Sequence, residues 1–297
     1  MSSKILHSGF AAIIGRPNAG KSTLLNRLTG VKVSIVSSKP QTTRSRVMGV
    51  MNEGDTQIVF VDTPGIHKAR TKLGEYMEMS ISEALKDIDA LVFMIDTAAI
   101  LDKDIALAQE YASIRKPKFL LLNKIDTVKP DVLLAAIDRL KGVGYDEIFP
   151  VSAAKGDGIS EFVAAISGVM PEGPAYFPQD MPTDQPEQFI CAELIREKAL
   201  RYLREEVPHG IGVEILRYNK TEDAINIDVT MYCEKESHKS IIIGKNGQTL
   251  KKIGQEARLD MEKMTGEHVR LFIGVKVRPG WRNSAEDLKT LGYTMKG

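Results

Sequence analysis

Near its N-terminus the chain carries the segment Gly15-Arg16-Pro17-Asn18-Ala19-Gly20-Lys21-Ser22, which matches the phosphate-loop pattern G-x-x-x-x-G-K-[ST]. A strand-like apolar run, Phe10–Ile14, comes before it, and Ser22–Thr29 after it has the period of a helix. Glycines in such a loop let successive backbone N–H groups point at phosphate oxygens, and the start of the helix adds a favourable dipole. We therefore expect Lys21 to reach the β- and γ-phosphates of a nucleotide and Ser22 to bind Mg²⁺.

From this loop to about residue 170, short apolar runs alternate with longer amphipathic segments. The expected strands are Phe10–Ile14, Gln57–Val61, Ala90–Ile95, Lys118–Leu122 and Glu147–Val151. Helical patterns include Ser22–Thr29, Ile105–Ile114, Val132–Lys141 and Ile159–Val169. The alternation predicts an α/β P-loop domain whose mostly parallel sheet has helices on both faces.

Further motifs convert the phosphate site into a guanine-nucleotide site. Asp62-Thr63-Pro64-Gly65 follows an expected strand, where the aspartate can hold Mg²⁺ through water and the Gly65 amide can sense the γ-phosphate. Asn123-Lys124-Ile125-Asp126 also ends a strand, so that Asp126 can accept hydrogen bonds from the N1–H and the N2 amine of guanine. Adenine lacks that pair of donors, so the motif indicates GTP rather than ATP.

The last motif, Ser152-Ala153-Ala154-Lys155, is weak by itself and would offer the backbone N–H of Ala153 to guanine O6. Together the four motifs predict a set of nucleotide-binding residues. They are Gly15, Arg16, Pro17, Asn18, Ala19, Gly20, Lys21, Ser22, Thr23, Asp62, Thr63, Pro64, Gly65, Asn123, Lys124, Asp126, Ser152, Ala153 and Ala154.

The chain resembles the Era-like family of bacterial GTPases in the amino-acid sequence of its phosphate loop, in Gln41-Thr42-Thr43-Arg44 and in the Asp-Thr-Pro-Gly segment. The resemblance implies that residues 41–44 belong to the first switch loop, with Thr43 rather than Thr42 closing onto Mg²⁺ and the γ-phosphate. The implied metal ligands are therefore Ser22, Thr43 and Asp62, and Lys21, Thr43, Gly65 and Asn18 are the implied catalytic residues.

The resemblance also bears on the rate of hydrolysis. Ile66 stands where Ras-type GTPases carry the glutamine that orients the attacking water, and Era-like proteins share this substitution. The residue that positions the water therefore stays open. Family members with an asparagine at the position of Asn18 are thought to recruit K⁺ in place of an arginine finger. We expect slow hydrolysis and a timed switch whose conformational readout involves residues 36–46 and 62–80.

The periodicity fails between Met170 and Pro186, where prolines occupy positions 171, 174, 178, 182 and 186. We therefore predict a GTPase domain over residues 1–175, a proline-rich linker over 176–188 and a second domain over 189–297. The second domain has the predicted order α-β-β-α-α-β, which indicates an α+β module. Its elements are a helix near Phe189–Glu205, strands near Ile211–Tyr218 and Ala224–Glu234, a glycine-interrupted helix pair across Lys239–Thr265, and a strand at His268–Val277.

The helix pair contains Ile241-Ile242-Ile243-Gly244-Lys245-Asn246-Gly247-Gln248. A G-x-x-G tetrapeptide in this setting resembles a type II KH domain, in which the loop clamps a nucleic-acid backbone beside an apolar groove. Each isoleucine could line that groove or fill the core, and Trp281 could stack on a base or pack. The expected RNA contacts are Ile243, Gly244, Lys245, Asn246, Gly247 and Lys251, with Lys276, Arg278 and Arg282 in the basic tail.

The overall composition does not by itself indicate or exclude a nucleic-acid-binding protein. The formal net charge is +1, although residues 235–282 hold eleven Lys and Arg against five Asp and Glu, an excess that is more often a solvated face than a binding site. Cys191 and Cys233 suggest neither a disulfide framework nor a zinc site. No signal peptide or membrane span is evident, so we expect a cytoplasmic protein.

By resemblance, the partners are the 3′ region of small-subunit ribosomal RNA and the small subunit whose assembly the GTP-bound state aids. The family also implies peripheral attachment to the cytoplasmic face of the inner membrane, and a monomer is expected. Two rivals remain. An ATP-dependent P-loop enzyme leaves Asn123–Asp126 unexplained, and a module with a merely structural nucleotide site would bind protein through its second domain.

Overall fold

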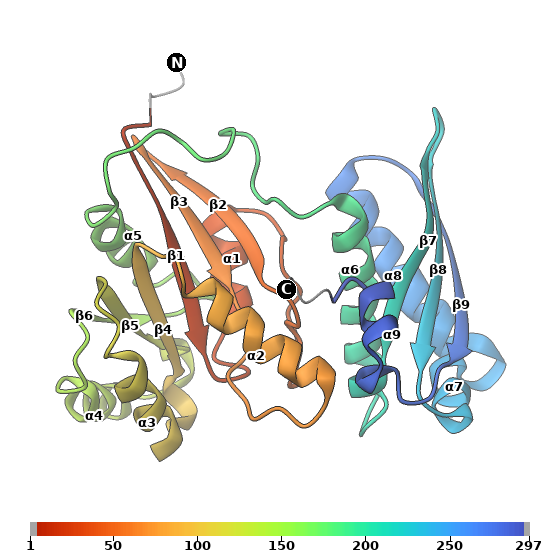
Figure 1. The fold of residues 1–297 in the computed structure, drawn as a ribbon, viewed down its shortest axis with the longest axis horizontal. Coiled ribbons are helices and arrows are strands. Elements are labelled where there is room, and N and C mark those ends of the chain that lie inside the picture. Colours follow the sequence, from red (N-terminus) through yellow and green to blue (C-terminus); the bar gives the residue numbers. More distant parts are fainter. Residues whose placement is uncertain (1–4, 294–297) are drawn as a thin grey trace. The chain divides into compact units, whose positions relative to one another are not determined.

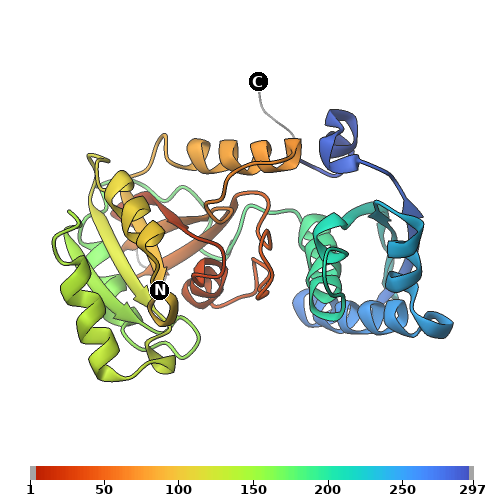
Figure 2. The ribbon, with the colours of Figure 1, turned by 90° about the horizontal axis from the view of Figure 1, so that it is seen from below.

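The computed structural model describes residues 5–293, which fall into two compact units, each with its own β-sheet (Figure 1, Figure 2). The first unit holds residues 5–34, 43–67 and 78–184, and the second holds 35–42, 68–77 and 185–293. The division into domains 1–175 and 189–297 stays a prediction, and these units differ from it in that 35–42 and 68–77 group with the second unit. No helix in the described part of the chain is long and apolar enough to span a membrane.

The sheet of the first unit has the strand order β2-β3-β1-β4-β5-β6. Its strands are β1 (His7–Gly15), β2 (Val47–Glu53), β3 (Thr56–Asp62), β4 (Ala90–Asp96), β5 (Lys118–Asn123) and β6 (Glu147–Val151). All neighbours are parallel except β2, which pairs antiparallel with β3. The five expected strands are present, and β2 is an addition. Parallel strands end at one edge, so the motifs that follow β1, β3, β5 and β6 share that edge.

Helices cover both faces of this sheet, as predicted. The helices are α1 (Lys21–Thr29), α2 (Lys72–Ala84), α3 (Asp102–Tyr111), α4 (Pro130–Leu140) and α5 (Ile159–Ser167). One face packs Ile81, Ala108 and Leu140 from α2, α3 and α4 against buried side chains of β1, β4 and β5. On α5, Phe162 contacts the rings of Phe60, Phe119 and Phe149. Burial of these apolar side chains supplies the main driving force for folding of this unit.

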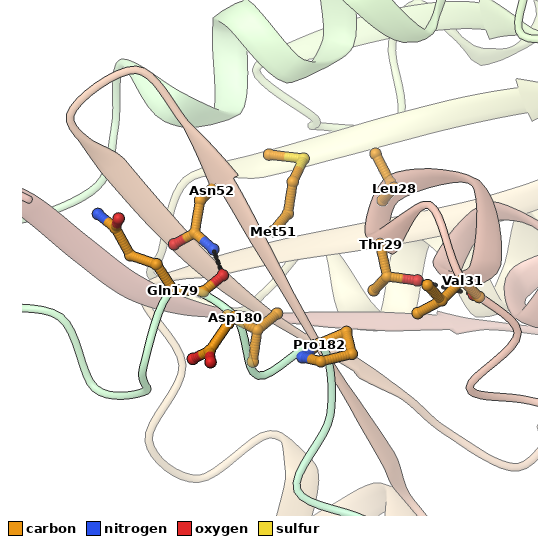
Figure 3. Close-up of a pocket in the computed structure, with 9 residues that line it drawn as sticks. Leu28, Thr29, Val31, Met51, Asn52, Gln179, Asp180 and Pro182 are labelled. Atoms are coloured by element: carbon orange, nitrogen blue, oxygen red, sulfur yellow. Dashed lines mark hydrogen bonds between the residues drawn. The ribbon is translucent and has the colours of Figure 1, made fainter. Parts of the chain in front are cut away.

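The expected linker is not a free connector over its first part. Gln57 holds it to β3, because its Oε1 accepts from the N–H groups of Tyr176 and Phe177 at 2.8 and 2.9 Å. Farther along, Val50 N–H donates to Pro182 O at 2.8 Å and the Asn52 side chain donates to Gln179 O at 3.1 Å. Residues 176–184 therefore belong to the first unit. They help to line a shallow cavity of about 400 Å³ that contains no residue of the nucleotide motifs (Figure 3).

The second unit is a three-stranded sheet with helices packed on one face. Its main elements are α6 (Glu187–Tyr202), β7 (Gly212–Lys220), β8 (Ile225–Cys233), α7 (Glu236–Ile243), α8 (Gln248–Thr265), β9 (Val269–Val277) and α9 (Ala285–Thr290). Strands β7 and β8 are antiparallel, whereas β8 and β9 are parallel and need the crossover through α7 and α8. One apolar core joins α6, α7 and α8 to the strands. The order α-β-β-α-α-β agrees with the predicted α+β module.

Three-residue 3₁₀ helices complete the secondary structure. They are η1 (Thr97–Ala99), η2 (Ile125–Thr127), η3 (Pro208–Gly210), η4 (Lys245–Gly247) and η5 (Trp281–Asn283).

Within the second unit, Arg196 donates to the backbone carbonyls of Gln41 and Thr42, which accounts for the grouping of residues 35–42 with α6. Both cysteines, Cys191 and Cys233, are buried free thiols.

Candidate nucleotide site and nucleic-acid interface

The phosphate loop joins the end of β1 to the start of α1, and its shape depends on two glycines. Gly15 and Gly20 have φ angles of 150° and 106°. A Cβ at Gly20 would lie 2.1 Å from Asn123 Nδ2, and one at Gly15 would lie 2.3 Å from the Met94 carbonyl oxygen. Only glycine therefore fits either position.

Lys21 lies inside this loop and is 6% exposed. Its Nζ donates to the carbonyl oxygens of Gly15 and Arg16, each at 3.2 Å. Burial lowers the pKa of the Lys21 ammonium, and the nearby Asp62 carboxylate opposes that effect. A buried ammonium that donates to carbonyl oxygens is suited to bind an anion such as a phosphate.

Three oxygen-bearing side chains meet beside Lys21. Ser22 Oγ donates to Asp62 Oδ2 at 2.6 Å, and Thr43 Oγ1 lies 2.9 Å from Ser22 Oγ and 3.4 Å from Asp62 Oδ2. The Thr42 hydroxyl instead donates to Lys39 O at 2.6 Å, so Thr43 is the threonine found here. Ser34 Oγ also donates to Asp62 Oδ2, at 3.1 Å, a contact that no motif indicates.

The Asp62 carboxylate fits a divalent cation. It is 0% exposed, and its Oδ1 has no hydrogen-bond partner among the described residues. Burial raises the pKa of Asp62, whereas Lys21 and the hydroxyls of Ser22, Ser34 and Thr43 lower it. Carboxylate and hydroxyl oxygens are the hard ligands that Mg²⁺ prefers, usually together with waters and phosphate oxygens. Ser22, Thr43 and Asp62 are the residues that would hold the ion, directly or through water.

Gly65 lies against the phosphate loop. A Cβ at this position would come within 2.6 Å of Pro17 N and 2.7 Å of Pro17 Cα, both backbone atoms. The following residue continues the contact, because Ile66 N–H donates to Gly15 O at 3.0 Å. The second switch segment is therefore held to the phosphate loop through backbone groups, where its amides can respond to a γ-phosphate.

Asn123 ties the base-recognition segments together. Its Nδ2 donates to Ala19 O at 2.7 Å, and its Oδ1 accepts from Ala153 N–H at 2.9 Å. To donate to guanine O6 as predicted, the Ala153 N–H would have to share its hydrogen with Asn123 Oδ1. Asp126 Oδ1 accepts from Ser152 Oγ at 2.7 Å, and this bond holds the carboxylate in place. The predicted pair of acceptors is thus held by a neighbouring motif.

Two further ion pairs brace the site. The Arg16 side chain donates to Asp104 Oδ2 at 2.8 Å, so it points to α3. The part of Arg16 that contacts the phosphate loop is its backbone, whose carbonyl accepts from Lys21. Lys124 adopts a positive φ of 67° and its Nζ pairs with Asp96 Oδ2 at 2.5 Å. Among the remaining predicted residues, Asn18 is exposed at the tip of the loop, with φ of 66°.

Replacing Asp126 with asparagine is expected to shift the base preference from guanine to xanthine. The variant keeps an acceptor for Ser152 but presents an amide donor where guanine also donates, whereas xanthine carries a carbonyl at C2. Loss of two charge-assisted hydrogen bonds, at about 1.5–3 kcal/mol each, should weaken GTP binding at least about 100-fold. Titrations with GTP and XTP would measure both affinities, and unchanged GTP affinity would remove Asp126 from this role.

In the second unit, the G-x-x-G turn joins α7 to α8. Gly244 has φ of 72° and ψ of 175°, and a Cβ there would lie 2.2 Å from Thr249 Oγ1. Asn246 and Gly247 also have positive φ angles, 52° and 75°, and a Cβ at Gly247 would meet no atom within 4 Å. The turn thus leaves open space at its tip and is followed by the N-terminus of an 18-residue helix, a combination that suits phosphate.

The side chains around the turn divide into core and surface. Ile242 is buried in the core, Ile243 is half-buried and Ile241 is 50% exposed. Lys245, Asn246 and Lys251 are exposed. The structure therefore brings together six of the predicted RNA contacts, namely Ile243, Gly244, Lys245, Asn246, Gly247 and Lys251, at this turn and the start of α8.

The predicted contacts in the basic tail are not part of that group. Lys276 alternates with the core residues Val275 and Val277, so it lies on the sheet face opposite the helices. Arg278 pairs with Asp287 at 2.5 Å, and Arg282 pairs with Glu234 at 2.6 Å.

Trp281 is fully buried and donates from Nε1 to Gly210 O at 2.9 Å, which settles its role as packing rather than base stacking. The RNA contacts expected of Lys276, Arg278 and Arg282 stay predictions, and Arg278 and Arg282 would have to share their guanidinium groups between these carboxylates and RNA.

Comparisons with known proteins agree with both halves of this geometry. Residues 10–124 match the family model described as 50S ribosome-binding GTPase, and residues 206–282 match that of the KH domain. GTPase Era of Ruminiclostridium cellulolyticum is 50% identical over 96% of this chain and 97% of the relative. GTPase Era of Alkaliphilus metalliredigens is 46% identical over 96% of this chain and 98% of the relative.

Two solved structures are similar over 98% of this chain and 100% of theirs, each at 40% identity and a TM-score of 0.93. One is Era in complex with MgGDPNP and nucleotides 1506–1542 of 16S ribosomal RNA. The other is a variant of Aquifex aeolicus Era bound to GDP and AlF₄⁻. Similarity of this extent covers both units and not the nucleotide domain alone.

Proposed function

Because the chain belongs to the Era family of GTPases, we propose that it binds the 3′ region of small-subunit ribosomal RNA and assists assembly of the small ribosomal subunit. The chain is a GTPase that hydrolyses GTP to GDP and phosphate, and it carries a KH domain. The observation that supports the proposal best is the presence in one chain of a guanine-nucleotide site and an open, exposed G-x-x-G turn. The solved relative that contains a 16S ribosomal RNA fragment supports the choice of RNA.

The residues of the first unit have separable roles in hydrolysis. Lys21 neutralises negative charge on the β- and γ-phosphates, while backbone N–H groups of the loop position them. Ser22, Thr43 and Asp62 would hold Mg²⁺, and the ion would neutralise negative charge on the same phosphates. Thr43 lies in the first switch and Gly65 in the second, so loss of the γ-phosphate would release both segments. That release is the expected switch between the GTP and GDP states.

K⁺ dependence belongs to this proposal. Asn18 is exposed at the tip of the phosphate loop, where an oxygen could bind a monovalent ion next to the phosphates. Exchanging NaCl for KCl at constant ionic strength is expected to raise GTP turnover roughly tenfold, through added positive charge at the transition state. Asn18→Gly, which tolerates the φ of 66°, should abolish the difference. Equal turnover of the parent protein in the two salts would rule out the ion.

An RNA titration tests the function directly. The full chain is mixed with an RNA of the small-subunit 3′ region, or with a scrambled RNA of equal length, in the presence of GDPNP or GDP. We expect tighter binding of the specific RNA, with an effect of the nucleotide on affinity. Equal binding of both RNAs would leave only non-specific attraction to phosphates. Binding of neither RNA would favour the rival function, in which the second unit binds a protein.

A cytoplasmic location, a monomeric state and, by resemblance to the family, peripheral attachment to the inner membrane stay predictions.

A further inference from the structure

The residue that follows Gly65 cannot orient the attacking water. Its side chain, that of Ile66, packs against the apolar cluster between the sheet and α2, α3 and α4. Its N–H group is used in the bond to Gly15 O. The isoleucine side chain has no polar group, so a side chain that orients water must come from elsewhere.

His67 is the next residue, and its ring has a defined tautomer. Nδ1 lies 3.0 Å from the carbonyl oxygen of Gly65. A carbonyl can only accept, so Nδ1 carries the proton, and Nε2 of the neutral ring is then an acceptor. Nε2 is shielded from solvent and has no hydrogen-bond partner among residues 5–293. A buried acceptor of this kind is costly unless a donor reaches it, so it is suited to accept from a small donor such as water.

The position of the ring follows from the contacts of Gly65. The Gly65 backbone lies against Pro17, where an added Cβ would come within 2.6 Å of the Pro17 nitrogen. The carbonyl that anchors the His67 ring therefore belongs to a residue in contact with the phosphate loop. In the same segment, Asp62 Oδ1 is a second buried acceptor for which the described residues supply no donor.

We propose that His67 is a catalytic residue whose Nε2 accepts a hydrogen bond from the water that attacks the γ-phosphorus of GTP. In that step the water oxygen bonds to phosphorus, and the bond from phosphorus to the β–γ bridging oxygen breaks. The bridging oxygen leaves with GDP, and the water protons end on the released phosphate and in solvent. His67 takes the role that glutamine has in Ras-type enzymes. This inference rests on the GTP hydrolysis assigned above.

Two amide substitutions separate a catalytic from a structural role. In His67→Asn the amide nitrogen can replace Nδ1 and keep the bond to Gly65, but no group replaces Nε2. In His67→Gln the longer side chain brings an amide group to the place of Nε2 and loses the bond from Nδ1. His67→Ala removes both. His238→Asn is the matched control, because His238 Nδ1 in α7 is likewise buried without a partner in the described chain.

The measurements are the single-turnover rate of GTP hydrolysis, the affinity for GDPNP and the affinity for GDP with AlF₄⁻, a mimic of the transition state. We expect His67→Asn and His67→Ala to lower the rate on the order of 100-fold, the low end for a positioned acid or base group. Their affinity for GDPNP should be unchanged and that for the mimic should fall. His67→Gln should retain most of the rate, and His238→Asn all of it.

Two outcomes would overturn the inference. If His67→Asn kept the rate and His67→Gln lost it, the ring would serve only to hold the Gly65 carbonyl. If all three variants hydrolysed GTP like the parent, His67 would have no part in the reaction, and the GTPase assignment would stand. Absence of hydrolysis by the parent protein would instead count against the assigned activity.

Discussion

Replacing Lys21 with alanine is expected to lower kcat/KM for GTP by about 100- to 1000-fold, the usual effect of removing one preorganised donor from a transition state. Lys21 Nζ is buried beside the Gly15 and Arg16 carbonyls, where few waters can substitute for it. Charge on the transferring phosphoryl group would then lose a preorganised protein cation. Steady-state turnover of the Lys21→Ala variant measures the effect. Lys103→Ala, an exposed lysine on α3, is the matched control and should behave like the parent.

The same variant should not lose stability when nucleotide is absent. Burial lowers the pKa of Lys21, so between its folded pKa and its ordinary value the unfolded chain binds more protons than the folded chain. The charged ammonium therefore opposes folding below that window, and stability rises as pH rises through it. Removing the lysine removes this opposition. Thermal melting should show an unchanged or higher Tm without nucleotide and a smaller rise on adding GDPNP. A collapsed Tm would mean that the loss of turnover reflects unfolding.

Strands could be predicted where a short apolar run marks them in the sequence. The prediction missed a strand where packing between distant residues determines the local structure. Strands β1, β3, β4, β5 and β6 are short apolar runs, and each was expected within two or three residues of its observed ends. β2 was not expected, and Gly49 is its third residue. A Cβ at Gly49 would lie 2.5 Å from Leu25 Cδ1 and 2.6 Å from Thr29 Cγ2. The glycine that weakens the strand pattern is therefore what allows α1 to pack closely on β2.

The candidate site shows the same limit. Motif residues such as Ser22, Asp62 and Asp126 could be predicted, because each lies at the carboxyl end of a strand in a short, recognisable segment. Asp104 could not, since it pairs with Arg16 across 88 residues of sequence and lies in an ordinary amphipathic helix. The ion pairs of the tail could not be predicted for a related reason. A run of basic residues indicates charge but not whether Glu234 or Asp287 neutralises it in the fold.

The second large effect concerns the G-x-x-G turn. Replacing Lys245 and Asn246 together with aspartate is expected to abolish RNA binding. Both side chains are exposed at a turn with open space at its tip, where an RNA backbone would come closest. Two carboxylates would face phosphates at short range, and loss of the lysine would lower the salt dependence of binding by about 0.7 in log–log slope for a single strand. A gel shift with the small-subunit 3′ RNA at low salt measures the loss.

The turn should survive the change, because Asp tolerates the left-handed conformation that Asn246 adopts at φ of 52°. A matched control is the exposed pair Asn219 and Lys220 at the end of β7, both changed to aspartate. The control change removes the exposed ion pair between Lys220 and Glu267, which contributes little to the stability of the fold. The control should bind RNA within a few-fold of the parent protein, and both double variants should bind GTP like the parent. Equal RNA binding by all three proteins would mean that the turn only connects α7 to α8. The RNA surface would then have to include Lys276, which is exposed on the sheet face opposite the helices.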